Sequence, residues 1–266
     1  MGIVNVTPDS FSDGGRFDTT ERAVAHGRVL LDEGADLLDI GGESTRPGAT
    51  RPLVAEELAR VVPVIRELAE AGVLVSVDTM RSEVAEAALA AGAGMVNDVS
   101  GGLADPRILA VVAGSDAHYV AMHWRAHADR MLDFSDYAPE GVVPAVRREL
   151  GERLEAIEAA GIPRERVLLD PGLGFAKQPG HNWELLTALD ELEGLGCPLL
   201  VGASRKSFLG ALLAEDGVQR AVEEREHAHA ALVALLARRG VAYLRVHDVR
   251  ATRDALAVVH AMGEMR

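Results

Sequence analysis

The chain has 266 residues, of which 48% are hydrophobic and 26% charged, and its formal net charge is −14. This composition supplies enough apolar material for a packed core and excludes a disordered chain. The acidic balance also argues against nucleic acid or an anionic membrane as a partner, since either would need a broad basic face. The length fits one α/β barrel of about 250 residues, so we expect a single domain over residues 1–266.

Short β-branched or Leu-rich runs alternate with longer stretches of helical periodicity along the chain. We predict eight strands, at Gly2–Val6, Asp36–Ile40, Val73–Val77, Gly94–Val99, His118–Met122, Arg166–Leu169, Pro198–Val201 and Ala242–Val246. The predicted helices are Thr20–Glu33, Ala55–Ala71, Arg81–Ala91, Pro106–Ala113, Val142–Ala160, Trp183–Glu193, Phe208–Leu213, Arg225–Arg239 and Thr252–Met262. Eight strand–helix units predict an α/β fold that is a single (β/α)8 TIM barrel, with a doubly wound open sheet as the alternative.

Glycines and irregular stretches mark the ends of these elements. Five predicted helices are followed by a glycine that suits a left-handed C-terminal cap: Gly34, Gly72, Gly92, Gly161 and Gly240. The stretch from Arg125 to Pro144 is the least regular, and we expect a long loop there that folds over the site of a barrel.

The chain carries no visible targeting or disulfide signal. No apolar run approaches the roughly 20 residues that cross a membrane, and residues 1–5 do not resemble a signal peptide. The single cysteine, Cys197, excludes a disulfide framework or a thiolate metal cage within one chain and is interpreted as a small buried apolar residue. We therefore expect a cytoplasmic protein.

Polar residues follow every predicted strand. They are Asn5, Asp39 with Glu43, Asp78, Asn97 with Asp98, His123 after Met122, Asp170, Ser204–Ser207, and Arg245 with His247 and Asp248. A single Asp at a strand end is explained as well by a structural role, as a turn residue or a helix cap, as by a functional role. In a parallel barrel, however, the carboxyl ends of all strands form the active-site rim. The convergence of so many polar residues therefore predicts a functional site.

Lysine occurs only at Lys177 and Lys206, whereas 25 positions carry arginine. An ammonium is a compact donor that directs one charge at a carbonyl or a phosphate, so both lysines are site candidates, although chance retention explains Lys177 equally well. The segment Gly202–Ser207 resembles a phosphate-binding loop only superficially, since the glycine directly before the lysine is missing. We expect Ser207 to cap the next helix, whose N–H groups suit a carboxylate or phosphate.

A metal site is considered because the predicted rim is rich in carboxylates. Zinc-dependent barrel hydrolases usually carry His-x-His on the first strand, where this chain has Asn5. His227 and His229 lie two positions apart in a predicted helix, where they face different ways, and we expect them at the surface. Asn5 is suited to give one oxygen to Mg²⁺ held mostly by water and substrate phosphates.

Seven segments resemble dihydropteroate synthases, the pterin-binding barrel enzymes of folate synthesis, over nearly the whole chain. Two are long and specific, MGIVNVTPDSFSDGG at 1–15 and DIGGESTRPG at 39–48. Five are shorter and follow in the family's order: Ser76–Thr79, Asn97–Gly101, Leu169–Phe175, Gly202–Lys206 and Arg245–Val249. The resemblance implies a transferase that joins 6-hydroxymethyl-7,8-dihydropterin diphosphate to 4-aminobenzoate, releasing diphosphate before the amine attacks. It also implies Mg²⁺ as cofactor, a homodimer and a sulfonamide target.

The resemblance assigns roles to individual residues. The implied catalytic residues are Asp13, Arg46, Asp78 and Lys206, and the implied metal contact is Asn5. The implied pterin pocket contains Asp78, Asn97, Met122, Asp170, Phe175, Lys206 and Arg245, and the implied diphosphate cradle contains Asn5, Arg245 and His247. The implied aminobenzoate contacts are Phe11, Asp13, Thr45, Arg46 and Pro47, with the carboxylate near Ser207.

Other functions stay open at this level. A non-catalytic pterin binder would keep Asp170 and Asn97 but would not need the first two long segments, which are intact here. A corrinoid-linked methyltransferase shares the pterin barrel but has no use for Arg46 and His247 as an anion cradle. The helix start at Arg225–Ala231 departs from the family pattern, and an inactive paralogue is a further alternative.

Overall fold

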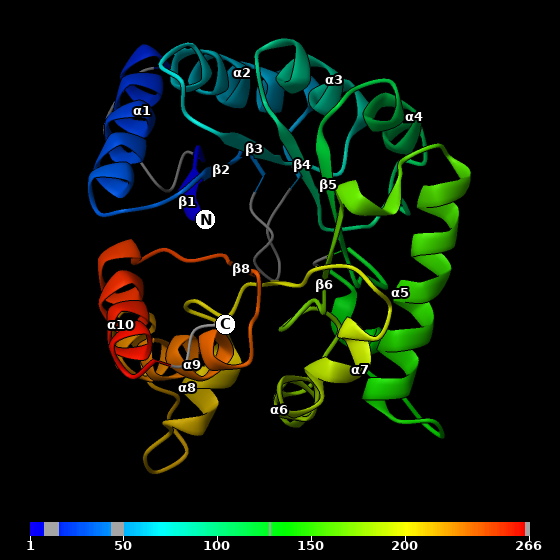
Figure 1. Cartoon of the computed structure of the whole chain (residues 1–266), viewed down its shortest axis with the longest axis vertical. Coiled ribbons are helices and arrows are strands. Elements are labelled where there is room, and N and C mark those ends of the chain that lie inside the picture. Colours follow the sequence, from blue (N-terminus) through cyan, green and yellow to red (C-terminus); the bar gives the residue numbers. More distant parts are fainter. Residues whose placement is uncertain (8–15, 44–50, 128, 264–266) are drawn as a thin grey trace.

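The computed structural model describes residues 1–7, 16–43, 51–127 and 129–263, in which helices surround a ring of strands (Figure 1). The strands are β1 (Gly2–Asn5), β2 (Leu38–Gly41), β3 (Val75–Asp78), β4 (Met95–Asp98), β5 (His118–Met122), β6 (Val167–Asp170), β7 (Leu200–Val201) and β8 (Tyr243–Leu244). The helices are α1 (Arg16–Asp32), α2 (Val54–Glu70), α3 (Ser82–Ala90), α4 (Arg107–Ala113), α5 (Val142–Ala159), α6 (Pro179–Thr187), α7 (Leu189–Glu193), α8 (Ser207–Leu212), α9 (Glu226–Arg238) and α10 (Val249–Ala261). Short 3₁₀ turns cover Met131–Phe134, Arg164–Arg166 and Val222–Arg225.

The eight strands close into a parallel barrel. Strands β1 to β6 form one sheet in sequence order, and β7 pairs with β8. The Leu169 N–H donates to Pro198 O at 3.0 Å, which joins β6 to the chain entering β7. The Ile3 N–H donates to Val246 O at 3.0 Å, which joins β1 to the chain leaving β8. The predicted (β/α)8 barrel is thereby confirmed, and the open-sheet alternative is wrong.

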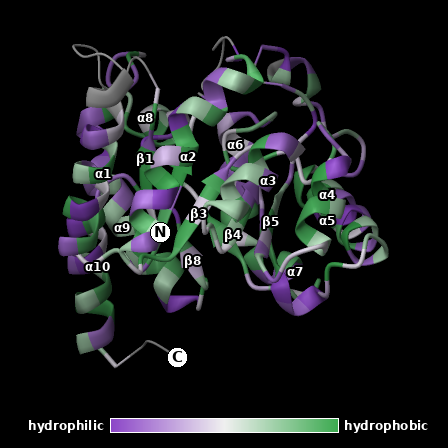
Figure 2. Ribbon diagram, turned by 90° about the horizontal axis from the view of Figure 1, so that it is seen from above, coloured by the Kyte–Doolittle hydropathy of each residue, from purple (hydrophilic) through white to green (hydrophobic). Residues whose placement is uncertain are grey.

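Two apolar regions hold the barrel together. The interior of the barrel is filled by the side chains of Met1, Leu37, Met95, Val120, Leu168 and Leu200, with Tyr243 packed against them. A larger core lies between the strands and the inward faces of the helices, where Val and Leu residues of both layers meet. Figure 2 shows this distribution, with hydrophobic residues on the strands and hydrophilic residues on the outer helix faces. The carboxyl ends of the strands carry polar side chains and a third, smaller apolar cluster.

Several element boundaries differ from the sequence prediction for local reasons. Helix α10 begins at Val249, three residues early, because Asp248 caps it by accepting the Ala251 N–H at 2.9 Å. The predicted helix at Trp183–Glu193 is two helices that meet at Ala188, where the Thr187 hydroxyl donates to Glu184 O and so competes with the helical ladder. The five predicted glycine caps have φ between +83° and +104°, which confirms them.

The N-terminus of α8 corrects a further prediction. Lys206, with φ −69° and ψ 150°, is the N-cap residue, and Ser207 is the first helical residue. Ser207 therefore does not cap the helix as predicted, and its side chain is exposed. None of the helices in the described part of the chain is long and apolar enough to cross a membrane.

Candidate active site

Four strand ends place three polar side chains at one level of the barrel. Asn5 on β1, Gly41 on β2, Asp78 on β3 and Asn97 on β4 are paired in register. Residues in register on neighbouring parallel strands point to the same face of the sheet. Gly41 keeps the space between its neighbours open, since a Cβ there would lie 3.6 Å from Asp78 Oδ2 and 3.7 Å from Asn5 Oδ1. The sequence-predicted Asn5, Asp78 and Asn97 are thus brought together.

Arg245 crosses the barrel and ties two carboxylates. It follows β8, and its Nε donates to Asp39 Oδ2 at 2.6 Å while its Nη2 donates to Asp78 Oδ2 at 2.7 Å. Strand β8 does not neighbour β2 or β3 in the ring, so these contacts pass through the interior. The guanidinium balances the two buried acids and holds Asp78 in place.

Asp39 also fixes the orientation of the Asn97 amide. Asn97 Nδ2 donates to Asp39 Oδ2 at 2.9 Å, and both side chains are buried. A carboxylate only accepts hydrogen bonds, so the amide nitrogen must face Asp39 and the amide oxygen must face elsewhere. Asn97 therefore presents an acceptor to a ligand at the barrel end. Sequence reasoning predicted Asp39 at the active-site rim but assigned it no role in substrate binding or catalysis.

Asp170 begins a tight turn that carries other predicted residues. It is paired in register with Met122, and its Oδ1 accepts the Gly172 N–H at 2.7 Å. Lys206 Nζ donates to Leu173 O in the same turn and lies 5.0 Å from the ring centroid of Phe175. The structure therefore brings together the Asp170, Lys206, Phe175 and Met122 that were predicted for the pterin pocket.

An apolar wall lies beside these polar groups. The buried side chains of Met80, Val99 and Met122 pack together, and Phe175 and Trp124 pack against them. Apolar contacts of this kind suit a flat aromatic ring. Sequence reasoning found Met122 and Phe175 but missed the other three, which also follow strand ends.

Burial shifts the protonation of the main ionisable groups. Desolvation raises the pKa of Asp78 to about 7, although Arg245 opposes the shift. Desolvation likewise raises the pKa of Asp170, opposed by Lys206, and lowers the pKa of Lys206 to about 8. The site thus pairs groups whose charges depend on each other, a pattern common at functional sites.

His247 lies at the end of β8 beside a serine. Its Nδ1 is 3.0 Å from Ser204 Oγ, which also accepts the His247 N–H at 3.3 Å. Arg245, two residues earlier, shares this rim. Two of the three residues predicted for the diphosphate cradle, Arg245 and His247, therefore lie on one edge of the barrel.

Asp98 and His229 have structural roles in the barrel, and the predicted aminobenzoate contacts lie outside the described residues. Asp98 accepts hydrogen bonds from Ser100, the Gly102 N–H and the Tyr119 hydroxyl, so it holds a turn and does not join the rim site. His229 is buried and 2.8 Å from Glu226 Oε1, so its predicted surface position is wrong. Phe11, Asp13, Thr45, Arg46 and Pro47 belong to segments 8–15 and 44–50, which are outside the described residues.

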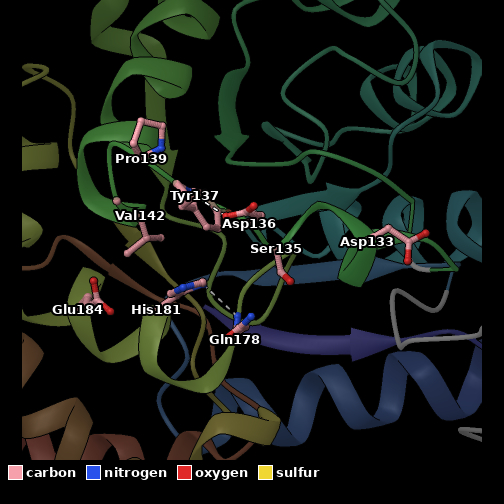
Figure 3. A pocket seen from close by; sticks show the side chains of 11 residues that line it. Asp133, Ser135, Asp136, Tyr137, Pro139, Val142, Gln178, His181 and Glu184 are labelled. Carbon is pink, nitrogen blue, oxygen red and sulfur yellow. Dashed lines mark hydrogen bonds between the residues drawn. The ribbon is translucent and has the colours of Figure 1, made fainter.

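A separate surface pocket of about 370 Å³ opens beside the predicted loop between β5 and α5 (Figure 3). Tyr137 and His181 meet there edge to face with ring centroids 5.1 Å apart, and Gln178 donates its N–H to His181 Nδ1. Among the described residues, none of those predicted to bind substrate lines this pocket. The Tyr137 hydroxyl donates to Ala176 O at 3.0 Å, so the loop braces the segment after Asp170.

Comparisons with known proteins agree with this geometry. Residues 1–247 match the family model described as pterin binding enzyme. The dihydropteroate synthase of Mycobacterium leprae (strain TN) is 51% identical over 263 residues, covering 98% of this chain and 92% of the relative. That of Streptococcus pyogenes serotype M6 is 43% identical over 260 residues, covering 97% of this chain and 93% of the relative.

Solved structures give the same result. The dihydropteroate synthase of Xanthomonas albilineans with 4-aminobenzoic acid is 50% identical, with a TM-score of 0.90, and the match covers 100% of this chain and 93% of that chain. The same enzyme in complex with 7,8-dihydropteroate matches with a TM-score of 0.87 and 47% identity, covering 100% and 94%. The chain therefore belongs to the dihydropteroate synthase family of pterin-binding enzymes.

Proposed function

We propose that this chain condenses 6-hydroxymethyl-7,8-dihydropterin diphosphate with 4-aminobenzoate, forming 7,8-dihydropteroate and releasing diphosphate. The observation that carries the proposal is the arrangement of Asp170 and Asn97 at one barrel end, with Lys206 and Arg245 beside them. A buried carboxylate, an amide of fixed orientation and an ammonium together match the donors and acceptors of a pterin edge.

Pterin recognition divides among these groups by their chemistry. Asp170 accepts two N–H groups from the aminopterin edge, and the Asn97 oxygen accepts a further N–H because its nitrogen is held by Asp39. Lys206 donates to the carbonyl side of the ring. Phe175 and Met122 pack on the ring faces.

The reaction needs charge stabilisation more than a base. When the carbon–oxygen bond to diphosphate breaks, positive charge develops on the pterin, and the Asp78 carboxylate offsets it. Arg245 holds Asp78 at 2.7 Å and favours its ionised form against the desolvation that raises its pKa. The amine of 4-aminobenzoate already carries a lone pair, so loss of diphosphate precedes its attack and no strong base is required.

The leaving diphosphate is assigned to Asn5, Arg245 and His247. Among the described residues no group of three or more His, Cys, Asp or Glu side chains is arranged to hold a metal, and Asn5 offers one amide oxygen. This donor set fits Mg²⁺ that takes its other ligands from water and the diphosphate. Mg²⁺, when bound, supplies positive charge to the leaving group.

The aminobenzoate contacts are proposed from the resemblance. Phe11, Asp13, Thr45, Arg46 and Pro47 surround the second substrate, with Arg46 and Asp13 in catalytic roles. Its carboxylate lies near Ser207, which is exposed at the start of α8.

Assembly and location are proposed as well. Residues 1–266 act as one cytoplasmic domain whose single thiol, Cys197, is buried. Leu235 on α9 and Val258 on α10 are both 60% exposed, and these two helices pack against each other. We assign these exposed apolar side chains to a homodimer contact. A light-scattering mass of about 28 kDa, that of one chain, would contradict the dimer.

The decisive experiment is an assay of the purified chain with both substrates and Mg²⁺. We expect diphosphate release that depends on 4-aminobenzoate, together with 7,8-dihydropteroate in stoichiometric amount. Pterin binding without release of diphosphate would indicate a non-catalytic pterin binder, and absence of both binding and turnover would overturn the proposal.

A further inference from the structure

Lys177 is a buried cation that the proposed reaction does not use. It is only 4% exposed, and its Nζ donates to Gly172 O at 2.9 Å, to Phe175 O at 3.0 Å and to His123 Nδ1 at 2.8 Å. Two of these acceptors lie in the turn that follows Asp170. A lysine this deeply buried is costly unless its charge and donors are used.

His123 extends the contact outward to helix α5. Its Nε2 is 2.9 Å from Glu149 Oε2, and Glu149 is also paired with Arg125 at 2.6 Å. His123 is the residue directly after Met122, and its backbone N–H donates to Asp170 O at 2.9 Å. The chain of contacts from Glu149 through His123 to Lys177 therefore joins α5, the end of β5 and the turn after β6.

The protonation states follow from the contacts. Burial lowers the pKa of His123 to about 4, so the ring is neutral at pH 7, accepts at Nδ1 and donates from Nε2 to the Glu149 carboxylate. Burial also lowers the pKa of Lys177. Three acceptors surround Nζ, which matches the three N–H bonds of an ammonium, whereas a neutral amine would leave one acceptor without a donor.

We propose that Lys177 is a positioning residue for pterin recognition, which holds the Gly172–Phe175 turn in its binding shape and places a second ammonium behind Asp170. The inference rests on the proposed function, since it concerns the pterin pocket of that reaction. Lys177 touches neither substrate and acts through Asp170 and Phe175.

The charges around Asp170 explain why pterin recognition needs the positive charge of Lys177 in addition to its hydrogen bonds. Lys206 at the start of α8, Arg245 after β8 and Lys177 after β6 all favour ionised Asp170 against the desolvation that raises its pKa. On the far side of Lys177 lie neutral His123 and the pair of Glu149 and Arg125. Loss of the Lys177 charge therefore raises the pKa of Asp170. As the pH falls, the Asp170 carboxylate that accepts two pterin N–H groups then becomes protonated at a higher pH than in the wild type.

The test compares Lys177→Met with a matched control, Arg166→Met. Arg166 is also a cation that donates to two backbone carbonyls, Ser115 O and Ala117 O, but at the opposite end of the barrel. We expect Lys177→Met to bind 6-hydroxymethylpterin about 10- to 100-fold more weakly. The acid limb of the pH dependence of 6-hydroxymethylpterin binding, which does not include the carbon–oxygen cleavage that Asp78 assists, should move up by roughly one pH unit, while the KM for 4-aminobenzoate changes little. Arg166→Met should leave the acid limb in place.

A second pair of variants covers the case in which Lys177→Met does not fold. In His123→Asn the side-chain oxygen takes the place of Nδ1 and still accepts from Lys177, whereas in His123→Gln the polar end takes the place of Nε2. We expect weaker pterin binding in the Gln variant than in the Asn variant. Equal binding in these two variants, or wild-type binding and an unmoved acid limb in Lys177→Met, would overturn the inference. A wild-type chain that neither binds pterin nor turns over would instead overturn the proposed function.

Discussion

Lys177 and Lys206, the two lysines of the chain, donate to backbone carbonyls of one turn, Gly172–Phe175. Lys177 binds the carbonyls of Gly172 and Phe175, and Lys206 binds that of Leu173. The turn needs φ of +65° at Gly172, where an added Cβ would lie 2.3 Å from His123 O. A compact ammonium fits among the carbonyls of so tight a turn, whereas a guanidinium is a wide fork. This explains why lysine stands here in a chain that otherwise uses arginine.

Asp170→Asn should abolish pterin recognition while the fold survives. The substitution replaces an acceptor-only group with an amide that turns N–H groups toward the N–H groups of the pterin edge. We expect a loss of roughly 2 to 5 kcal/mol, or about 30-fold to several thousand-fold in affinity. Calorimetric titration with a pterin analogue measures it.

Thermal unfolding of the same variant is the control. Asp170 also accepts the Gly172 N–H at 2.7 Å, and the Asn oxygen is able to accept it as well. The melting temperature should therefore stay close to that of the wild type. Unchanged pterin affinity would mean that Asp170 acts only as a turn residue.

Activity should fall above about pH 8 because Lys206 loses its proton. Burial lowers the pKa of Lys206 to about 8, an effect that nearby Asp170 and Asp78 oppose and Arg245 reinforces. The ammonium form donates to Leu173 O and to the pterin carbonyl side, so the free enzyme loses this donor as the pH rises through the pKa. We expect kcat/KM for the pterin diphosphate to decline about tenfold per pH unit there.

The Lys206→Met variant isolates this effect. It should be weakly active at every pH and should lack the alkaline limb. An alkaline limb that persists in Lys206→Met would assign the titration to another group.

The sequence alone was sufficient to predict the barrel and most of its rim. The eight apolar runs correspond to the eight strands, because a strand buried on both faces leaves a continuous apolar signature. The predicted bounds of β5, His118–Met122, match the structure. Register then brings Asn5, Asp78 and Asn97 to one level without further information.

Partners of buried polar groups could not be predicted in the same way. Asp98 and Asp170 both end a strand, yet one is bound by the Tyr119 hydroxyl and a turn while the other faces Lys206. His229 is spaced as a helix surface residue but is buried beside Glu226. The partner of each buried polar group depends on residues far apart in the chain, such as His123 and Lys177, which are separated by 54 positions. Only the count of lysines marked Lys177 as unusual.

Asp39→Asn should weaken pterin binding through Asn97. The carboxylate holds the Asn97 nitrogen at 2.9 Å and Arg245 Nε at 2.6 Å, and an amide in its place no longer forces the Asn97 oxygen toward the ligand. We expect a loss of about 1 to 3 kcal/mol in both pterin affinity and stability.

Ser76→Ala is the matched control for Asp39→Asn. Ser76 is buried and paired in register with Asp39, but its hydroxyl has no hydrogen-bond partner among the described residues. Its removal should cost less than about 0.5 kcal/mol. Equal effects of the two substitutions on pterin binding would show that Asp39 does not orient Asn97.

The stability of the fold should decrease between about pH 6.5 and pH 4 because of His123. The pKa of this buried ring is about 4 in the folded chain and 6.5 ordinarily, because desolvation penalises the charged form. Between these values the unfolded chain binds a proton that the folded chain does not, so protonation favours unfolding. The contribution of the neutral His123 ring to the free energy of unfolding is complete above about pH 6.5 and amounts to about 3 kcal/mol.

Denaturant unfolding at pH 7 and pH 4.5 measures this contribution as a difference between variants. His123→Gln should have a smaller pH-dependent change in the free energy of unfolding than the wild type, because the titrating ring is gone. His260→Gln, at the exposed end of α10, controls for loss of a histidine and should follow the wild type. If His123→Gln loses stability toward acid as steeply as the wild type, the acid sensitivity comes from carboxylates such as Asp105, whose pKa is lowered by hydrogen bonds from Arg107 and Ser82 against desolvation, and the neutral His123 ring contributes nothing to it.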